Sequence, residues 1–253
     1  MARLILAISL FLLVACDGEE KNQTTNAPAG TTSLGGDVVL GLSSQTLVHD
    51  GLIREFLLYV PTAYDGARKL PLVLNFHGNG GTPEAHMAYS DMRDFAELEE
   101  FIVIYPQGTL LDGDSHWNSM VSADGNKSDA DDLGFVNALL MLMSSNYALD
   151  ESRVYATGYS NGADFTYTLA CYLSERITGI APVSGLMTEL SLQPCTPAHP
   201  TAVMIFNGTA DYVRPYGGYD GYLESVDDAA NFWVGYNNAG SSPEITNINN
   251  SGL

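Results

Sequence analysis

Basic residues are scarce in this 253-residue chain, where 10 lysines and arginines stand against 30 aspartates and glutamates. The formal charge of −20 repels phosphate backbones and anionic lipid headgroups, so we expect no nucleic-acid partner. The chain also has no break in composition that would suggest two domains. Its hydrophobic content of 45% and charged content of 16% are typical of one globular unit with a sizeable core.

The N-terminal apolar run is too short to span a bilayer as a mature helix. Residues 4–14 are apolar and follow Arg3, as in an export signal peptide. The run ends in LVAC, which resembles the bacterial lipoprotein signal with Cys16 as the lipidated residue; a plain secretory peptide is the alternative. We therefore expect an exported protein, either a lipoprotein of the bacterial cell envelope or secreted, with membrane contact only through this lipid anchor.

The predicted organisation has three parts. Residues 1–16 are the signal peptide with its lipidated cysteine, and residues 17–40 form a polar, flexible tether. Residues 41–253 form the folded domain.

Cysteine is also rare. With Cys16 lipidated, Cys171 and Cys195 remain, and an oxidising compartment allows this pair to form a disulfide; two buried free thiols are the alternative. Two cysteines without a nearby histidine pair lack the usual ligand spacing of a metal site, so we predict no metal and no cofactor. The aspartate-rich loop at residues 112–127 lacks the EF-hand pattern, and we expect it to be solvated.

Apolar strands alternate with amphipathic helices along the chain. Strands are predicted at residues 46–60 (a hairpin turning at Asp50 and Gly51), 70–76, 101–106, 153–157, 177–185 and 201–208. Helices are predicted at residues 82–100, with Thr82 as N-cap and Pro83 in the first turn, and at 128–148 and 163–175. This alternation predicts an α/β fold with a mostly parallel central sheet flanked by helices.

The pentapeptide GYSNG places Ser160 between Gly158 and Gly162. Short G-x-S-x-G matches also arise by chance in glycine- and serine-rich loops. Here, however, the serine follows an apolar strand and precedes a helix, which is the setting that a nucleophile at a sharp strand-to-helix turn requires. The helix N-terminus would add partial positive charge next to a developing oxyanion. We therefore predict that Ser160 is a nucleophile.

Two further stretches fit such a nucleophile. HGNGG follows the strand at 70–76, and a glycine-rich turn there can aim backbone N–H groups at a bound carbonyl oxygen. The predicted oxyanion donors are the N–H of Asn161 and one at Gly78 or Asn79; a plain strand-ending turn is the alternative. Asp211, in the loop after the strand at 201–208, is the candidate acid, although a lone loop aspartate is often only solvated.

Five motifs resemble, in order and spacing, the esterase/polyhydroxybutyrate depolymerase-like group of the α/β-hydrolase fold, which includes feruloyl and acetylxylan esterases. They are HGNGG (77–81), WNS (117–119), DDLGF (131–135), RVYATGYSNGA (153–163) and NGTADYVRPYGG (207–218). The resemblance covers residues 52–218. Three residues depart from the family pattern. Relatives commonly have histidine where this chain has Asn207, and they commonly have smaller or apolar residues where it has Tyr212 and Arg214.

The resemblance implies a serine carboxylic ester hydrolase that acts through an acyl-enzyme. Its substrates would be feruloyl or acetyl esters of plant polysaccharides, or short-chain polyesters. Ser160 resembles the nucleophile, Asp211 the triad acid and the 77–79 turn an oxyanion donor, and Cys171 and Cys195 stand where many relatives have a disulfide. An exopeptidase of the same fold, or a non-catalytic carbohydrate-binding surface lipoprotein, are the alternatives.

Aromatic side chains offer few guides to the substrate. Trp117, Tyr159 and Tyr212 are candidates to line a substrate cleft.

A base for the nucleophile is missing, because no histidine follows Asp211 and in this motif order the base comes last. The five histidines are His49, His77, His86, His116 and His199. We expect that the chain is C-terminally incomplete and lacks a last strand and helix, since relatives carry the histidine near their C-terminus. The alternatives are a histidine from elsewhere, with His116 the least implausible, and a non-catalytic binding protein.

Overall fold

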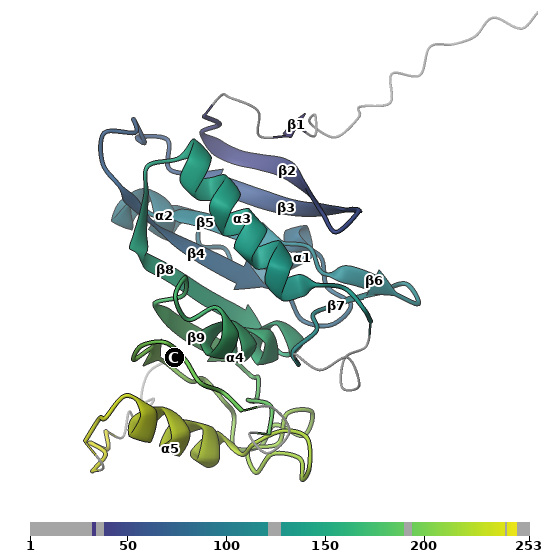
Figure 1. The fold of residues 1–253 in the computed structure, drawn as a ribbon, viewed down its shortest axis with the longest axis vertical. Helices are drawn as coiled ribbons and strands as arrows, with labels where there is room; N and C mark the ends of the chain where they lie inside the picture. The colour runs from purple at the N-terminus through teal and green to yellow at the C-terminus, as the bar shows by residue number, and fades with distance from the viewer. Residues whose placement is uncertain (1–31, 34–37, 121–127, 190–193, 241, 247–253) are drawn as a thin grey trace, which may run out of the picture.

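The computed structural model describes residues 32–33, 38–120, 128–189, 194–240 and 242–246. Its centre is an eight-stranded sheet in the order β1-β2-β3-β5-β4-β8-β9-β10 (Figure 1). Strands β2, β3 and β5 pair in antiparallel fashion, whereas β5, β4, β8, β9 and β10 run parallel to their neighbours. The predicted α/β class with a mostly parallel sheet is confirmed. The predicted signal peptide and Cys16 lie outside the described residues.

The N-terminal edge of the sheet is a hairpin. β2 (Gly41–His49) and β3 (Leu52–Val60) are joined at Asp50 and Gly51, whose φ angles of 48° and 75° suit the tight turn that such a dipeptide favours. The two-residue strand β1 (Thr32–Ser33) adds to β2 from within the segment predicted as a tether. The predicted boundary at residue 40 stays a prediction.

The central strands are apolar throughout because both faces of the sheet are covered there. Ile102 and Ile104 of β5 (Ile102–Pro106) pack into the main core, which α3 (Asp132–Asn146) and α4 (Asn161–Tyr172) cover. Val103 and Tyr105 point to the opposite face, where they join a second cluster beside Ala96 of α2 (Arg93–Glu99). β4 (Leu70–Phe76) lies next to β5, at the bounds expected from its apolar run.

Five helices flank the sheet in the described part of the chain. Figure 1 shows α3 (Asp132–Asn146) and α4 (Asn161–Tyr172) on the face toward the viewer and α5 (Val226–Tyr236) beyond β9. α5 was not predicted. The single helix expected over 82–100 is instead α1 (Pro83–Tyr89) and α2 (Arg93–Glu99), because the Asp91 carboxylate accepts the Arg93 N–H (3.0 Å) and starts a second helix. As expected, Thr82 caps α1.

The remaining strands place the carboxyl ends of the sheet. β8 (Leu149–Tyr159) runs between β4 and β9 (Gly179–Val183), and β10 (Ala202–Val203) is shorter than its apolar run suggested. A small hairpin, β6 (Thr109–Leu111) and β7 (Asp114–His116), forms in the loop predicted to be only solvated. None of the described helices is long and apolar enough to cross a lipid bilayer.

One face of the last strands carries an apolar groove of about 490 Å³. Tyr155, Met204 and Phe206 line it and are 37%, 60% and 49% exposed within the described part of the chain. Parallel sheets are normally covered on both faces, so an apolar surface of this kind on the last strands is unusual. The expected last strand and helix stay a prediction.

Cys171 and Cys195 form the disulfide that the sequence suggested. Cys171 lies in the last turn of α4, and Cys195 lies in the segment before β10, 24 residues later. The bond therefore closes a loop that holds β9, and it ties the helix after Ser160 to the chain leading toward Asp211.

Removing this disulfide should destabilise the fold. The double substitution Cys171→Ala and Cys195→Ala should lower the free energy of unfolding by about 3 kcal/mol, because opening a loop of this length restores entropy to the unfolded chain. Urea unfolding with and without dithiothreitol measures the effect. Dithiothreitol should destabilise only the wild type, and equal sensitivity in both proteins would contradict the assignment.

Candidate active site

Ser160 lies at a strained turn between β8 and α4. Its backbone has φ 53° and ψ −120°, a conformation that costs free energy for a residue with a side chain. The turn is held by the Ser160 N–H, which donates to the Val183 carbonyl at the end of β9 (3.0 Å), and by the Asp164 N–H, which donates to the Ser160 carbonyl (2.9 Å). The side chain is half-buried at the carboxyl edge of the sheet. This is the geometry predicted for a nucleophile turn.

The two glycines around Ser160 are required by close backbone contacts. A Cβ at Gly158 would lie 2.7 Å from the Gly162 carbonyl carbon and oxygen. A Cβ at Gly162 would lie 2.4 Å from both the Phe76 and His77 carbonyl oxygens at the end of β4. The N-terminus of α4 therefore packs directly on the end of β4, which brings the HGNGG turn to the serine.

The HGNGG turn adjoins Ser160. Gly78 is buried, and a Cβ there would lie 3.4 Å from the Ser160 Cβ and 3.2 Å from the Tyr159 ring. Asn79 follows at the surface. On the other side, Asn161 is the first residue of α4, so its backbone N–H is one of the four that a helix N-terminus leaves unpaired. Gly78, Asn79 and Asn161 thus lie on the two sides of the serine, as the prediction of oxyanion donors requires.

The β6–β7 hairpin supports the HGNGG turn. The Gly80 N–H donates to the Ser115 carbonyl (2.7 Å), and the Ser115 hydroxyl donates to the Gly81 carbonyl. Sequence reasoning missed this contact, although Asp112 and Gly113 at its tip are a favoured hairpin dipeptide that could have indicated it.

Asp211 lies in the loop that follows β10 and has an ordered carboxylate. Its Oδ1 accepts the N–H groups of Val213 and Arg214, each at 2.8 Å. The hydrogen bond from the Arg214 N–H, and after it that from the Val213 N–H, lower the pKa of Asp211 and keep the carboxylate ionised.

Arg214 ties this loop to the nucleophile helix. Its guanidinium donates to Asp164 Oδ2 (2.8 Å), and Asp164 lies one turn after Ser160 and is buried. Sequence analysis noted Arg214 only as a departure from the family pattern. The ion pair connects the candidate acid with the candidate nucleophile.

Three of the five histidines are buried, and burial lowers the pKa of two of them, His77 and His86. The Gly108 N–H donates to Nε2 of His77 (2.9 Å), which places the proton on Nδ1, and Nδ1 donates to the Gly78 carbonyl (2.7 Å). His86 Nε2 bonds the Asn75 side-chain oxygen (2.6 Å). Burial lowers the pKa of His77, and it lowers the pKa of His86 to about 4. His77 thus holds the HGNGG turn, and His86 ties α1 to β4 through Asn75.

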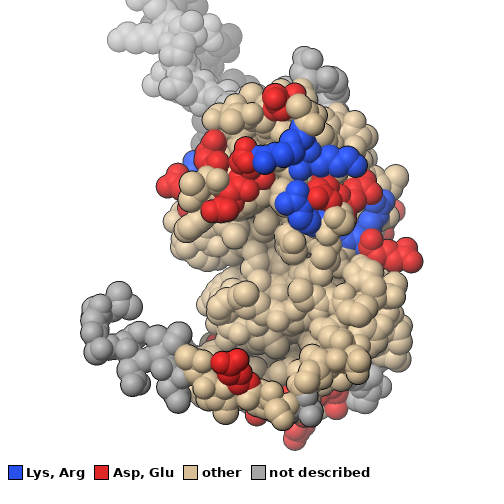
Figure 2. Space-filling model, turned by 90° about the vertical axis from the view of Figure 1, so that its left-hand side faces the viewer, with Lys and Arg blue, Asp and Glu red and all other residues tan. Residues whose placement is uncertain are grey.

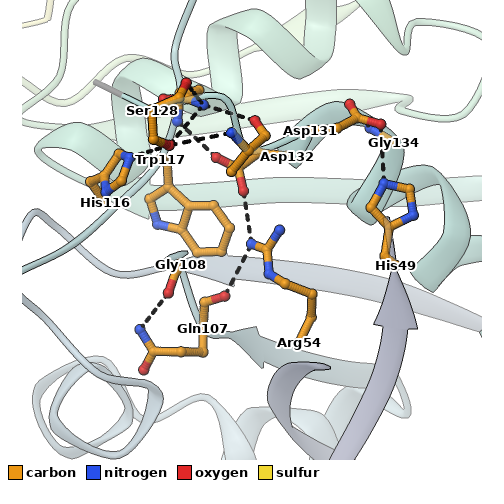
Figure 3. A network of polar contacts seen from close by, with 12 residues as sticks. His49, Arg54, Gln107, Gly108, His116, Trp117, Ser128, Asp131, Asp132 and Gly134 are labelled. Atoms are coloured by element: carbon orange, nitrogen blue, oxygen red, sulfur yellow. Dashed lines mark hydrogen bonds and ion pairs between the residues drawn. The ribbon is translucent and has the colours of Figure 1, made fainter. Parts of the chain in front are cut away.

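The other three histidines are also engaged elsewhere. His49 pairs with Asp131 (3.0 Å), and His116, 1% exposed, bonds the Ser128 hydroxyl through Nε2 (2.9 Å), as Figure 3 shows. His199 bonds the Pro200 carbonyl (3.0 Å). No hydrogen bond joins a histidine ring to Ser160 among the described residues. In His116, Nε2 is engaged with Ser128, whereas Nδ1 has no hydrogen-bond partner among the described residues.

The three candidate substrate-lining residues differ in position. Tyr159 is 45% exposed beside Gly78, and Tyr212 is 90% exposed beside Asp211, so both remain candidates. Trp117 is 1% exposed, and its ring stacks on Phe165 at 5.4 Å. The prediction that Trp117 lines an open cleft is wrong, because the indole fills the core under the site.

Most described basic side chains lie far from the serine. Arg68, Lys69, Arg153 and Arg176 precede or begin the parallel strands, at the edge opposite Ser160. Figure 2 shows basic and acidic side chains interspersed over one part of a face of the molecule, and a largely uncharged remainder. Several charged residues of the described chain form ion pairs, such as Arg153 with Asp150 at 2.6 Å. The described side chains hold no group of three or more His, Cys, Asp or Glu suited to a metal.

Gly162→Ala should disrupt this site. The added methyl group would meet two backbone oxygens that cannot move without shifting β4, so we expect the free energy of unfolding to fall by more than about 2 kcal/mol. Gly235→Ala is the matched control, since nothing lies within 4 Å of a Cβ there and Ala favours its helix. Urea unfolding of both variants measures the effect, and equal stabilities would contradict the packing described here.

Acid should destabilise the protein through His86. The unfolded chain takes up a proton below pH 6.5, whereas folded His86 stays neutral down to about pH 4, so stability is lost as pH falls through this window. His86→Gln should reduce the loss of the free energy of unfolding between pH 6.5 and about pH 4 by up to about 1.4 kcal/mol per pH unit. Urea unfolding at several pH values tests this, with His199→Gln as the histidine-removal control. Parallel curves for His86→Gln and wild type would refute it.

Known proteins resemble this chain in sequence and in fold. No family model matches the chain. A bifunctional acetylxylan esterase/xylanase of Neocallimastix patriciarum is 29% identical over 178 residues, which are 70% of this chain and 24% of that protein. Feruloyl esterase B of Piromyces equi is 26% identical over 167 residues, 65% of this chain and 30% of that protein. This chain thus spans less than a third of the length of these two relatives.

Solved structures share the fold. A thermostable esterase aligns with a TM-score of 0.56 at 22% identity, over 70% of this chain and 49% of that one. The carboxylesterase of Bacillus cereus aligns with a TM-score of 0.53 at 21% identity, over 73% and 81%. The chain therefore has the α/β-hydrolase fold and is similar in sequence to feruloyl and acetylxylan esterases, which confirms the resemblance that its motifs indicate.

Proposed function

We propose that the protein is a serine carboxylic ester hydrolase. The observation that carries this proposal is Ser160, held at a positive-φ turn at the carboxyl edge of the sheet, at the N-terminus of α4 and beside Gly78. A strained serine in this position, next to N–H groups that lack helix partners, is suited to nucleophilic attack on a carbonyl. Similarity to feruloyl and acetylxylan esterases supports the same reaction.

The reaction follows from these positions. The Ser160 hydroxyl oxygen attacks the ester carbonyl carbon while a base takes its proton. The N–H groups of Asn161 and of the Gly78–Asn79 turn donate hydrogen bonds to the oxyanion. The intermediate collapses, the bond to the alcohol oxygen breaks, and the alcohol leaves with the proton from the base. Water then attacks the acyl-serine with help from the same base, which releases the acid and restores Ser160.

The base in this proposal is a histidine that follows Asp211 along the polypeptide. The order of the motifs supports this assignment, as do the engaged rings of the five histidines described above. Asp211 is the proposed orienting acid, because two backbone N–H groups hold its Oδ1 and because hydrolases of this motif order place the acid after the nucleophile. The coding sequence beyond Leu253 tests this part of the proposal directly.

The proposed substrates are feruloyl or acetyl esters of plant polysaccharides, or short-chain polyesters. The acidic chain, whose described cations lie mostly at the far edge of the sheet, fits uncharged esters better than anionic ones. The proposed location is outside the cytoplasm, with Cys16 as a lipid anchor in the cell envelope.

A second candidate is a carbohydrate-binding protein that has lost catalysis. The observation in its favour is that every histidine ring in the described structure is engaged away from Ser160. Binding of xylan fragments without hydrolysis of any ester would support this candidate.

The full-length protein should hydrolyse p-nitrophenyl acetate, and Ser160→Ala should reduce kcat by at least about 10³-fold, because the variant has no oxygen to acylate. Release of p-nitrophenolate measures this.

Ser145→Ala is the control, because Ser145 is an exposed serine on α3. It should hydrolyse the ester at the wild-type rate. Turnover by Ser160→Ala equal to that of Ser145→Ala would rule out the proposed nucleophile.

A further inference from the structure

The two proposed oxyanion turns follow different strands, and the segment around Trp117 contacts both. On the α4 side, the Trp117 N–H donates to Asn161 Oδ1 (2.7 Å) and Asn161 Nδ2 donates to the Trp117 carbonyl (3.0 Å). Asn161 is buried, and this two-point pairing fixes its side chain. The direction of the backbone N–H of Asn161, next to Ser160, is therefore set partly by Trp117.

On the β4 side, the indole of Trp117 reaches the HGNGG turn. Its Nε1–H donates to the His77 carbonyl (3.0 Å), and the His77 ring in turn donates from Nδ1 to the Gly78 carbonyl. The indole is held in one orientation, since it stacks on Phe165 with an interplanar angle of 9° and meets Phe76 edge-on. One buried residue thus hydrogen-bonds to both turns.

The segment is anchored behind the site by a buried ion pair, drawn in Figure 3. The Asn118 N–H donates to Asp132 Oδ2 (2.9 Å), and Asp132 Oδ1 accepts from the Arg54 guanidinium (2.7 Å). Arg54 and Asp132 are almost fully buried, and the guanidinium lies 3.9 Å from the centre of the Phe135 ring. A buried pair with these additional bonds holds one geometry, because separating its members leaves a charge without a partner.

We propose that Trp117 is a positioning residue that sets the separation of the two oxyanion N–H groups, with the Arg54–Asp132 pair holding its segment in place. This inference rests on the proposed function. A phenylalanine would fill the same core without donating to His77, so the indole N–H does more than pack. Oxyanion stabilisation depends closely on donor geometry, and small displacements of either turn should weaken it.

The test separates oxyanion stabilisation from folding. Hydrolysis of p-nitrophenyl acetate by the full-length protein is compared with that of the thiono analogue, in which sulfur replaces the carbonyl oxygen. Sulfur accepts hydrogen bonds poorly, so the oxo-to-thiono ratio of kcat/KM reports on the oxyanion donors. Trp117→Phe should lower kcat for the oxo ester by about tenfold or more and lower this ratio, with KM little changed.

Trp233→Phe is the matched control. Trp233 is the chain's other tryptophan, is 3% exposed in α5, and its Nε1 has no hydrogen-bond partner within the described structure. It should change neither kcat nor the ratio. If Trp117→Phe does not fold, Asn161→Ala replaces it in the test. This substitution removes both side-chain hydrogen bonds to the Trp117 backbone but keeps the Asn161 backbone N–H, and it should lower the ratio in the same way.

Two outcomes would overturn this inference and leave the proposed function standing. One is wild-type kcat in the folded variant, and the other is a lower kcat with an unchanged oxo-to-thiono ratio, which would indicate a general structural effect. A wild-type protein that hydrolyses neither ester would instead refute the proposed function, and this inference with it.

Discussion

The steric contact between the start of α4 and the end of β4 is the constraint on which the site depends. A side chain at Gly158 or at Gly162 would collide with the backbone of the other glycine or with the carbonyls at the end of β4. Glycine at both positions therefore lets α4 pack closer to β4 than any other residue would allow. This close packing forces Ser160 into its left-handed turn and brings it beside Gly78. Strain at one serine thus arises from the packing of the whole sheet edge.

Around this turn, the rest of the edge is organised by buried polar contacts. Trp117 links the helix side to the strand side, and Arg214 links the Asp211 loop to α4 through Asp164. The described histidine rings take part in this framework or in other contacts away from Ser160; the His77 ring, for example, accepts the Gly108 N–H. The framework therefore holds the candidate nucleophile, the candidate oxyanion donors and the candidate acid on connected segments.

Local patterns predicted most of the fold. The apolar run of β4, the Asp50–Gly51 hairpin turn, the Thr82 cap and the serine turn all follow from short-range rules, and the structure agrees with each. The pairing of Cys171 with Cys195 also followed from the sequence.

What sequence reasoning missed depends on contacts between distant segments. Trp117 is a candidate cleft residue by its type, whereas its burial depends on Phe165 and His77, which lie far along the chain. α5 was missed, and the 82–100 helix was predicted unbroken, whereas α1 ends at Tyr89 and α2 begins at Arg93, whose N–H the Asp91 carboxylate accepts.

Covalent labelling of the full-length protein tests the central claim most directly, namely that the Ser160 hydroxyl is held ready for acylation. The protein is treated with a fluorophosphonate and then mapped by peptide mass spectrometry. We predict one phosphonyl group on Ser160, with the other serines unmodified. An unlabelled protein, or one labelled elsewhere but not at Ser160, would contradict the account.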